Sequence, residues 1–323
     1  MRRIGGDPNG TVVALSGGIG GAKLALGLSR VLPPERVIVV ANTGDVFEHL
    51  GLAISPDLDT LMYTLAGLSD PERGWGRRDE TWTFMAALAA LGGETWFQLG
   101  DGDLATHVER TRRLAAGETL SRITDNFCRR LGVRGRILPM SEDRVRTRVR
   151  TSDGWLEFQD YFVRRRCAPE VKELAYDGAA LAGPNPAFIA TLADARLRAV
   201  VICPSNPYLS VDPILALPGV RAALEACPAP VIAVSPIIGG RAVKGPTAKM
   251  MRELGLPSTA TAIAQHYDGL IDLFVVDHSE GEISLPNMRV ASAAILMSTL
   301  ADREALATAV LAFADEIRVE ARA

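Results

Sequence analysis

Short apolar runs separate longer segments with helical periodicity in this chain. Residues 11–15 and 37–41 are apolar and rich in β-branched side chains, and Leu24, Leu28 and Val31 lie between them at helical spacing. A strand, a helix and a second strand in succession form a βαβ unit, whose crossover requires parallel strands. Similar runs return later, at 199–203, 231–234 and 273–276. The pattern predicts an α/β fold with a mostly parallel sheet and helices on both faces.

The middle of the chain has a different pattern. Residues 103–131 are helical in period and strongly charged, and residues 144–151 alternate arginine with valine or threonine before a turn at 152–154 and a second β-like run at 155–163. These runs predict a β-hairpin, with the arginine row on a solvated edge strand. We therefore expect residues 1–103 and 196–323 to form a nucleotide-binding core, interrupted at 104–195 by an inserted helical and β-hairpin (α+β) subdomain. Further helices are predicted at 60–68, 80–91 and 301–317.

Composition narrows the function classes. The 323 residues carry a net charge of -3, with 48% hydrophobic and 23% charged residues, so a nucleic-acid partner is not expected. No apolar run reaches membrane-spanning length, and no apolar segment follows the N-terminal arginines, so neither a membrane segment nor a signal peptide is expected. The four cysteines form no CxxC pair, which favours a reducing, cytoplasmic setting over a zinc site or a disulfide framework.

A glycine-rich turn follows the first predicted strand. Residues 16–21 read Ser-Gly-Gly-Ile-Gly-Gly and lead directly into the predicted helix. Glycines allow a close backbone approach, and the helix start offers unpaired N–H groups, which together suit a phosphate. The loop matches neither the Walker A pattern nor G-x-G-x-x-G. A tight turn that binds nothing is the alternative, and the number of glycines favours a phosphate cradle.

Four loops leave the carboxyl ends of predicted parallel strands with polar or glycine residues. They span 16–21, 42–45, 204–207 and 235–245. Because ligands of open parallel sheets bind outside these ends, we expect the loops to form one composite site. Lys244, flanked by glycine in the last loop, is a candidate phosphate ligand.

Three acidic residues near these loops are candidate Mg²⁺ ligands. Asp45, Asp57 and Asp59 offer the oxygen atoms that Mg²⁺ takes beside a diphosphate. Asp57 has the alternative role of N-cap to the next helix, and Asp59 that of complementing the helix dipole. His107 has no metal-ligand spacing and is either a substrate contact or a structural histidine. The tryptophans of residues 75–96 could stack on a planar ring or pack in the core.

At these motifs the sequence resembles the 2-phospho-L-lactate transferase family of coenzyme F-420 biosynthesis. The stretches that carry the resemblance are collinear and span most of the chain: SGGIGGAKLALGL (16–28), NTGD (42–45), SPDLDTLMYTL (55–65), DPERGWGRRDETW (70–82), LGDGDLATH (99–107), ILPMSED (137–143), PSNPYLS (204–210) and AVSPIIGGRAVKGPTAKM (233–250). The resemblance implies a Rossmann-like core with an inserted domain, usually in a homodimer. It also implies Mg²⁺ and transfer of a phosphorylated three-carbon acid from a guanosine-diphosphate-linked donor to the ribityl hydroxyl of the deazaflavin Fo, with release of GMP.

The resemblance also assigns residues. It implies that Asp45 and Asp59 hold the metal and carry the catalysis. The residues that it implies for the nucleotide are Gly17, Gly18, Gly20, Gly21, Asn42, Ser205, Asn206, Gly239, Lys244 and Gly245. Those that it implies for Fo are Asp59, Trp75, Thr81, Trp82, Asp101, Gly102 and His107. Two residues depart from the family pattern: Gly102 stands where relatives commonly have arginine, and Val46 stands where many have a second acid.

The implied chemistry is in-line attack of a hydroxyl on the β-phosphorus, with Asp59 or Asp45 assisting deprotonation. It needs positioning and charge stabilisation rather than a nucleophilic side chain. Two other functions stay open, an NAD(P)-dependent oxidoreductase and a non-catalytic nucleotide-binding regulator of the same fold. The three-carbon acid also stays open between phospholactate, phosphoenolpyruvate and phosphoglycerate.

Overall fold

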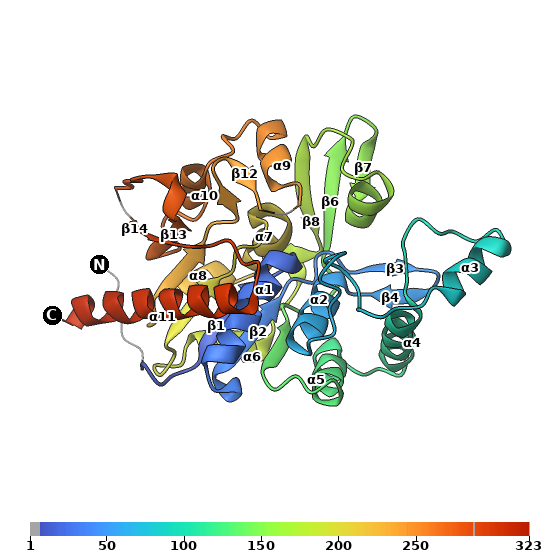
Figure 1. Cartoon of the computed structure of the whole chain (residues 1–323), viewed down its shortest axis with the longest axis horizontal. Coiled ribbons are helices and arrows are strands. Elements are labelled where there is room, and N and C mark those ends of the chain that lie inside the picture. Colours follow the sequence, from blue (N-terminus) through green and yellow to red (C-terminus); the bar gives the residue numbers. More distant parts are fainter. Residues whose placement is uncertain (1–6, 244, 287, 323) are drawn as a thin grey trace.

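A seven-stranded parallel sheet forms the centre of the molecule (Figure 1). The computed structural model describes residues 7–243, 245–286 and 288–322. The strand order is β14-β13-β10-β9-β1-β2-β5, and each pairing is parallel. The strands are β1 (Val12–Ser16), β2 (Val37–Ala41), β5 (Arg136–Pro139), β9 (Ala199–Ile202), β10 (Val231–Val234), β13 (Leu273–Asp277) and β14 (Arg289–Ala293). The five strands expected from apolar runs are confirmed, and β5 and β14 extend the sheet at its two edges.

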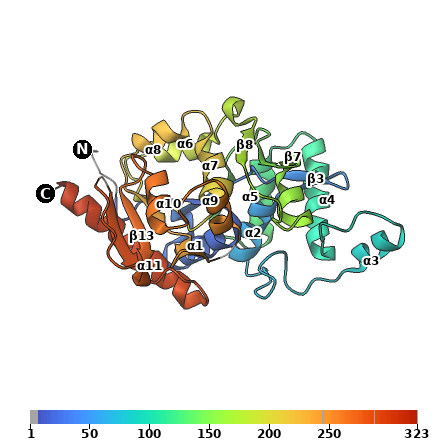
Figure 2. The same cartoon turned by 90° about the horizontal axis from the view of Figure 1, so that it is seen from above.

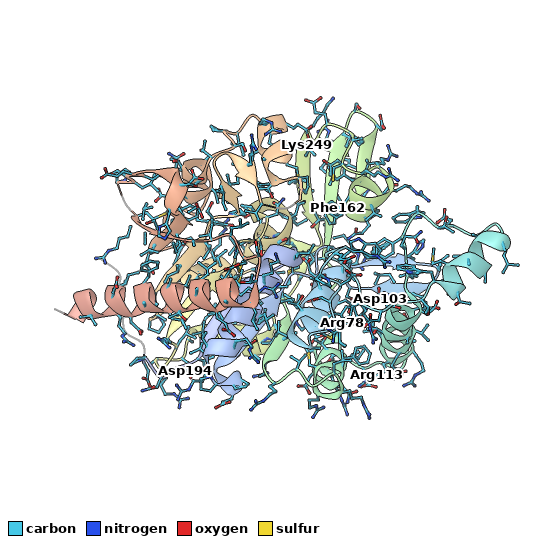
Figure 3. All side chains as sticks on the ribbon, in the orientation of Figure 1. Arg78, Asp103, Arg113, Phe162, Asp194 and Lys249 are labelled. Carbon is cyan, nitrogen blue, oxygen red and sulfur yellow. The ribbon has the colours of Figure 1, made fainter. Side chains whose placement is uncertain are left out.

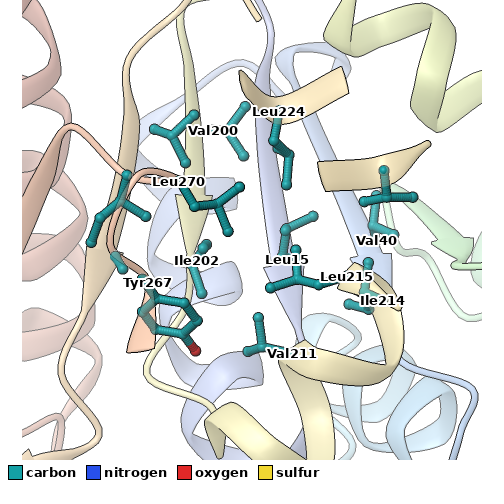
Figure 4. Close-up of a cluster of buried hydrophobic side chains, with 14 of the residues drawn as sticks. Leu15, Val40, Val200, Ile202, Val211, Ile214, Leu215, Leu224, Tyr267 and Leu270 are labelled. Atoms are coloured by element: carbon teal, nitrogen blue, oxygen red, sulfur yellow. The ribbon is translucent and has the colours of Figure 1, made fainter. Parts of the chain in front are cut away.

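The sheet is buried on both faces. Along β1, Val13 and Leu15 belong to one hydrophobic cluster, while Val12 and Ala14 belong to another. Successive side chains of a strand point to opposite faces, so a continuous apolar run serves both clusters at once. Figure 4 shows the first cluster, in which Leu15 and Ile202 meet side chains of the covering helices such as Ile214.

Helices cover the two faces in two layers (Figure 2). One layer packs against Val12 and Ala14 and consists of α1 (Gly18–Val31), α2 (Pro56–Leu65), α5 (Leu120–Arg130) and α11 (Leu300–Arg322). The other packs against Val13 and Leu15 and consists of α6 (Pro186–Leu192), α7 (Asp212–Leu215), α8 (Val220–Glu225) and α10 (Ala260–His266). The predicted α/β class is thereby confirmed. Across the described residues, every helix is too short or too polar to cross a bilayer.

A projecting region follows β2 and lies at the right of Figure 1. It contains the hairpin β3 (Phe47–His49)–β4 (Leu52–Ile54) and the helices α3 (Thr83–Ala90) and α4 (Asp101–Ala115). Leu50 and Gly51 form the hairpin turn with positive φ angles of 53° and 71°. Two successive positive φ values are typical of the tight turns that join antiparallel strands. Near the carboxyl end of β10 lie β11 (Ile237–Ile238), β12 (Arg241–Ala242) and α9 (Thr247–Glu253).

A second, three-stranded sheet corrects two expectations. Its order is β7 (Gly154–Glu157)–β6 (Arg146–Thr151)–β8 (Glu173–Asp177), so the arginine-bearing strand is the middle strand and not an edge. Arg148 lies 3.2 Å from Glu157 on β7, which shows that cross-strand ion pairs accommodate the arginine row. The second β-like run ends at Glu157, and residues 160–164 form a π-helical turn.

Strand β5 comes from the segment expected as an insertion but pairs with β2 in the central sheet. The structure shows that β5 belongs to the central sheet. The division of the chain into a core and an inserted subdomain at 104–195 stays a prediction.

Candidate active site

A cavity of about 290 Å³ lies at the carboxyl ends of the central strands. The chain order along the sheet reverses between β1 and β9, which is where open parallel sheets bind their ligands. The cavity draws on all four loops that the sequence analysis singled out. The predicted site residues that line it are Gly17, Gly18, Gly20, Asn42, Asp45, Trp75, Ser205, Asn206 and Gly245.

The glycine loop joins the β1 and β9 ends of this cavity. Gly18 begins α1 with a φ of 65°, a conformation that favours glycine. A side chain on Gly20 would meet the carbonyl oxygen of Pro204 at 2.5 Å. The Ser205 hydroxyl accepts the Gly17 N–H (3.1 Å) and donates to the Gly17 carbonyl (2.8 Å). Glycine at these positions allows the two loops to come into contact. Ile19 and Gly20, in the first turn of α1, line the cavity. N–H groups of a first turn have no intrahelical partner.

Among the described residues, Asp45 and Asp57 are the two carboxylates that line the cavity. The Asp57 N–H donates to Asp45 Oδ2 (2.9 Å), and Asp57 itself accepts from the Gly18 N–H (2.6 Å) and the Asn42 side-chain amide (2.9 Å). Burial and then the neighbouring Asp57 raise the pKa of Asp45 well above its ordinary value. Burial also raises the pKa of Asp57 to about 6, although the hydrogen bonds from Asn42 and Gly18 lower it.

The expected role of Asp57 as the cap of its own helix is wrong. Ser55 holds the N-cap position of α2, and the Asp57 carboxylate instead binds the first N–H of α1. Both Asp57 oxygens are therefore occupied. Asp45 Oδ1 is buried and has no hydrogen-bond partner among the described residues. A buried carboxylate oxygen without a donor is suited to a hard cation such as Mg²⁺, so the residues present fit the implied metal.

Asp59 lies in a buried ionic cluster outside the cavity lining. The Arg110 guanidinium binds both of its oxygens, with Nη1 at 3.1 Å from Oδ2. His107 Nδ1 is 3.6 Å from Asp59, and His107 Nε2 is 3.3 Å from Asp103. Burial raises the pKa of Asp59, although Arg110 lowers it. Asp103, labelled in Figure 3, belongs to the first turn of α4.

The same cluster offers a second set of metal ligands. Ligand atoms of Asp59, Asp103 and His107 all lie within 4.8 Å of one another, which is compatible with a divalent ion. For Asp103, burial raises the pKa, but the hydrogen bond and charge of His107 outweigh it and the pKa is lowered. Tyr63 donates to Asp103 at 2.7 Å. Asp45 and Asp59 are near enough for the charge of Asp59 to raise the pKa of Asp45, but the structure does not place them in one ligand set.

The residues expected to contact Fo cluster beside the cavity, and only Trp75 lines it. Trp75 meets the edge of Trp82, with ring centroids 6.2 Å apart. The Thr81 hydroxyl donates to Asp101 at 2.6 Å, and Gly102 follows in the first turn of α4.

Two expected nucleotide residues among the described ones, Gly21 and Gly239, do not line the cavity. Gly21 packs against the hydroxyls of Ser16 and Ser205, and the Gly239 N–H donates to Glu280 at 2.5 Å. Lys244 lies outside the described residues.

Sequence reasoning missed one wall of the cavity, formed by Phe158, Gln159 and Phe162. The two phenylalanines stack with centroids 5.3 Å apart, and the Gln159 amide donates to the Asp45 carbonyl at 3.3 Å. Their spacing of four residues is a helical signal, which the assignment of 155–163 to a strand concealed.

The parallel sheet, the reversal of strand order and the loop-built cavity define an α/β protein with a cavity at the carboxyl edge of the sheet, the edge at which open parallel sheets bind ligands. The sequence profile of one family, described as 2-phospho-L-lactate transferase CofD, matches residues 12–317. The chain belongs to this family, and this membership identifies it as a transferase.

Relatives agree with this membership, and a solved structure shares the fold. The chain is 41% identical to a phosphoenolpyruvate transferase of Kitasatospora aureofaciens over 95% of this chain and 98% of that protein. It is 38% identical to a phosphoenolpyruvate transferase of Mycobacterium tuberculosis over 89% of this chain and 93% of that protein. A crystal structure of a UPF0052 family member from Bacillus halodurans has the same fold, with a TM-score of 0.61 at 16% identity, over 94% of this chain and 98% of that chain.

Proposed function

We propose that this protein is a transferase of coenzyme F-420 biosynthesis that uses Fo as its acceptor. It transfers a phosphorylated three-carbon acid from a guanosine-diphosphate-linked donor to the ribityl hydroxyl of Fo and releases GMP. The observation that carries the proposal is the cavity lined by both the first turn of α1 and Asp45, whose buried Oδ1 has no hydrogen-bond partner among the described residues. The names of the relatives favour phosphoenolpyruvate as the transferred group over phospholactate and phosphoglycerate.

The cavity supplies groups for each part of the two substrates. The first turn of α1 offers N–H groups and Asn206 offers a side-chain amide, both suited to the diphosphate. Trp75, Phe158 and Phe162 offer apolar ring faces suited to a guanine base or a deazaflavin ring.

Asp45, with Asp57 beside it, holds the Mg²⁺ in this proposal. When bound, Mg²⁺ neutralises charge that develops on the diphosphate oxygens. The ribityl oxygen attacks the β-phosphorus, the bond from that phosphorus to the GMP oxygen breaks, and the hydroxyl proton passes to a carboxylate. Asp59 or Asp45 is the predicted acceptor of this proton. Asp59 remains a prediction as metal ligand and Fo contact, because in this structure Arg110 binds its oxygens.

The test is product formation. Purified protein is incubated with Fo, Mg²⁺ and each of the three donors, and the products are identified by mass spectrometry. We expect a phosphodiester-linked deazaflavin and GMP, most rapidly with the phosphoenolpyruvyl donor. Asp45→Asn should reduce turnover at least 100-fold without loss of the fold, whereas Glu48→Gln, at an exposed position of β3, should leave turnover unchanged. Nucleotide binding without turnover would favour the regulator, and tight NAD(P)H binding would favour the oxidoreductase.

A homodimer and a cytoplasmic location remain expectations.

A further inference from the structure

A second cavity, of about 270 Å³, lies on the three-stranded sheet of β6, β7 and β8 (Figure 1). Its lining residues are Arg144, Arg146, Arg148, Glu157, Asp177 and Gly178. Thr147, which alternates with the arginines along β6, is buried and packs against Gly44 in the loop that holds Asp45. Because successive side chains of a strand point to opposite faces, the arginines leave β6 on the other side. Among the described residues, none lines both this cavity and the first one.

Gly178 gives this cavity one of its walls. It follows β8 with a φ of 85°, a conformation that favours glycine. A Cβ atom at this position would lie 2.4 Å from the carbonyl oxygen of Arg144. The end of β8 therefore approaches the backbone that leads into β6, and a side chain at residue 178 would push the two segments apart.

One arginine pairs with both carboxylates of the cavity. Arg148 Nη1 lies 3.2 Å from Glu157 and 3.6 Å from Asp177, and Arg148 Nε donates to the Leu156 carbonyl at 3.3 Å. The lining contains two more arginines but no further carboxylate among the described residues. The cavity therefore carries a positive charge in excess.

Arg146 is a half-buried cation without an ion-pair partner among the described residues. Its Nη1 donates to the Val145 carbonyl at 2.8 Å, which is a neutral acceptor on its own strand. Burial, and then the charge of Arg144, lower the pKa of Arg146. The charges of Glu157 and Asp45 act in the opposite direction. The fold thus keeps two guanidinium groups near each other at the wall of a cavity, where an anion would relieve their repulsion.

We propose that this second cavity binds a small phosphate-class oxyanion, free or as the phosphate group of a small ester, between Arg144 and Arg146. The planar fork of a guanidinium group matches two oxygens of a phosphate, and a dianion stabilises both cations at once. Glu157 and Asp177 would repel a run of phosphates, so the site suits a small anion better than a nucleic acid. The inference is independent of the proposed function, because it uses none of the residues of the first cavity.

The experiment titrates inorganic phosphate and, separately, glycerol 3-phosphate into the full chain in EDTA, by calorimetry at constant ionic strength. The first turn of α1 is a second place where phosphate can bind, so the readout is the difference between variants. Arg146→Gln should weaken phosphate binding at this site at least tenfold, and Arg146→Lys, which keeps the charge without the fork, should lose less. Arg150→Gln is the matched control. Arg150 lies in the same row of β6, outside the cavity, and pairs with Glu173 at 2.9 Å, so its loss should leave phosphate binding unchanged.

Three results would overturn the inference. They are no saturable binding of either probe to the wild type, equal phosphate affinities of the wild type and Arg146→Gln, and equal losses in Arg146→Gln and Arg150→Gln. Thermal stabilisation by sodium chloride as large as that by sodium phosphate at the same ionic strength would also overturn it, because it shows general screening. Tighter binding of the ester than of phosphate, or the reverse, supports the site and identifies its preferred source of phosphate.

A variant that does not fold leaves the inference testable. If Arg146→Gln shows no cooperative melting, Arg144→Gln, at an exposed position, replaces it. A tenfold loss of phosphate affinity in that variant supports the inference, and an unchanged affinity overturns it. A failure of the transferase assay would alter none of these readouts, so the two proposals fail separately.

Discussion

Replacing Asp57 by asparagine should change how the stability of the ligand-free protein depends on pH. Asp57 is buried, and burial raises its pKa to about 6 from the ordinary 3.8. A group whose pKa is raised by folding stabilises the protein fully below its unfolded pKa, and this contribution is lost as the pH rises through the folded value. Asparagine does not titrate, so the variant does not lose this part of its stability as the pH rises.

The magnitude follows from the size of the pKa shift. A difference of about two pKa units corresponds to about 3 kcal/mol, and roughly half of it falls between pH 5 and pH 8. Asparagine also turns an NH₂ group toward the amide of Asn42, whose oxygen already accepts the Gly44 N–H at 2.8 Å. The lost hydrogen bond costs about 1–3 kcal/mol at every pH, so it shifts the curve without changing its slope.

The assay is urea unfolding in EDTA at pH 5, 6, 7 and 8. Relative to wild type, Asp57→Asn should gain about 1–2 kcal/mol of unfolding free energy from the lowest to the highest pH. The exposed Asp125→Asn on α5 is the matched control, and its difference from wild type should stay constant. A constant difference for Asp57→Asn, or one that moves in the opposite direction, would refute the assignment of a buried carboxylate with a raised pKa.

Two further substitutions test the packing around the site. Gly20→Ala places a methyl group 2.5 Å from the Pro204 carbonyl and should destabilise the protein by about 1–3 kcal/mol in urea unfolding; an unchanged midpoint would contradict the close approach. Arg110→Met leaves Asp59 buried without its neutralising partner and should cost about 3–5 kcal/mol, whereas Arg112→Met, at an exposed position on the same helix, should cost much less. Equal losses in the two arginine variants would show that the ionic cluster around Asp59 is not a buried charge pair.

Much of the central fold could be predicted because its signals are local. The buried strands are apolar throughout, and the glycine turn and helix that follow β1 have a clear period. β5 escaped prediction because its four residues, one of them proline, follow a charged helix and carry no distinctive pattern. The middle position of β6 was not predictable either, since its second partner, β8, comes from residues 173–177 and pairs with β6 only through the tertiary structure.

The site was predictable as a set of loops but not as a set of contacts. Parallel strands bring their carboxyl ends to one edge, which is why Asn42, Asp45 and Ser205 could be grouped from sequence. Nothing local shows that Arg110, 51 residues from Asp59, would bind that carboxylate. The same limit applies to Asp57, whose carboxylate caps a helix 39 residues earlier in the chain.

Unpaired polar atoms gather where the site is. Among the described residues, the buried side-chain oxygens of Thr43, Asp45, Ser55 and Thr147 lack hydrogen-bond partners, and all four belong to the segments that surround the β2 loop. Each buried polar group without a partner costs about 1–3 kcal/mol of folding free energy. Apolar side chains at these positions would avoid that cost. Of these four residues, Asp45 lines the cavity, and a ligand that supplies positive charge to its oxygen recovers that free energy on binding. The unpartnered oxygens and the raised pKa of Asp45 thus have one physical origin, and both should diminish together when a cation and a nucleotide bind.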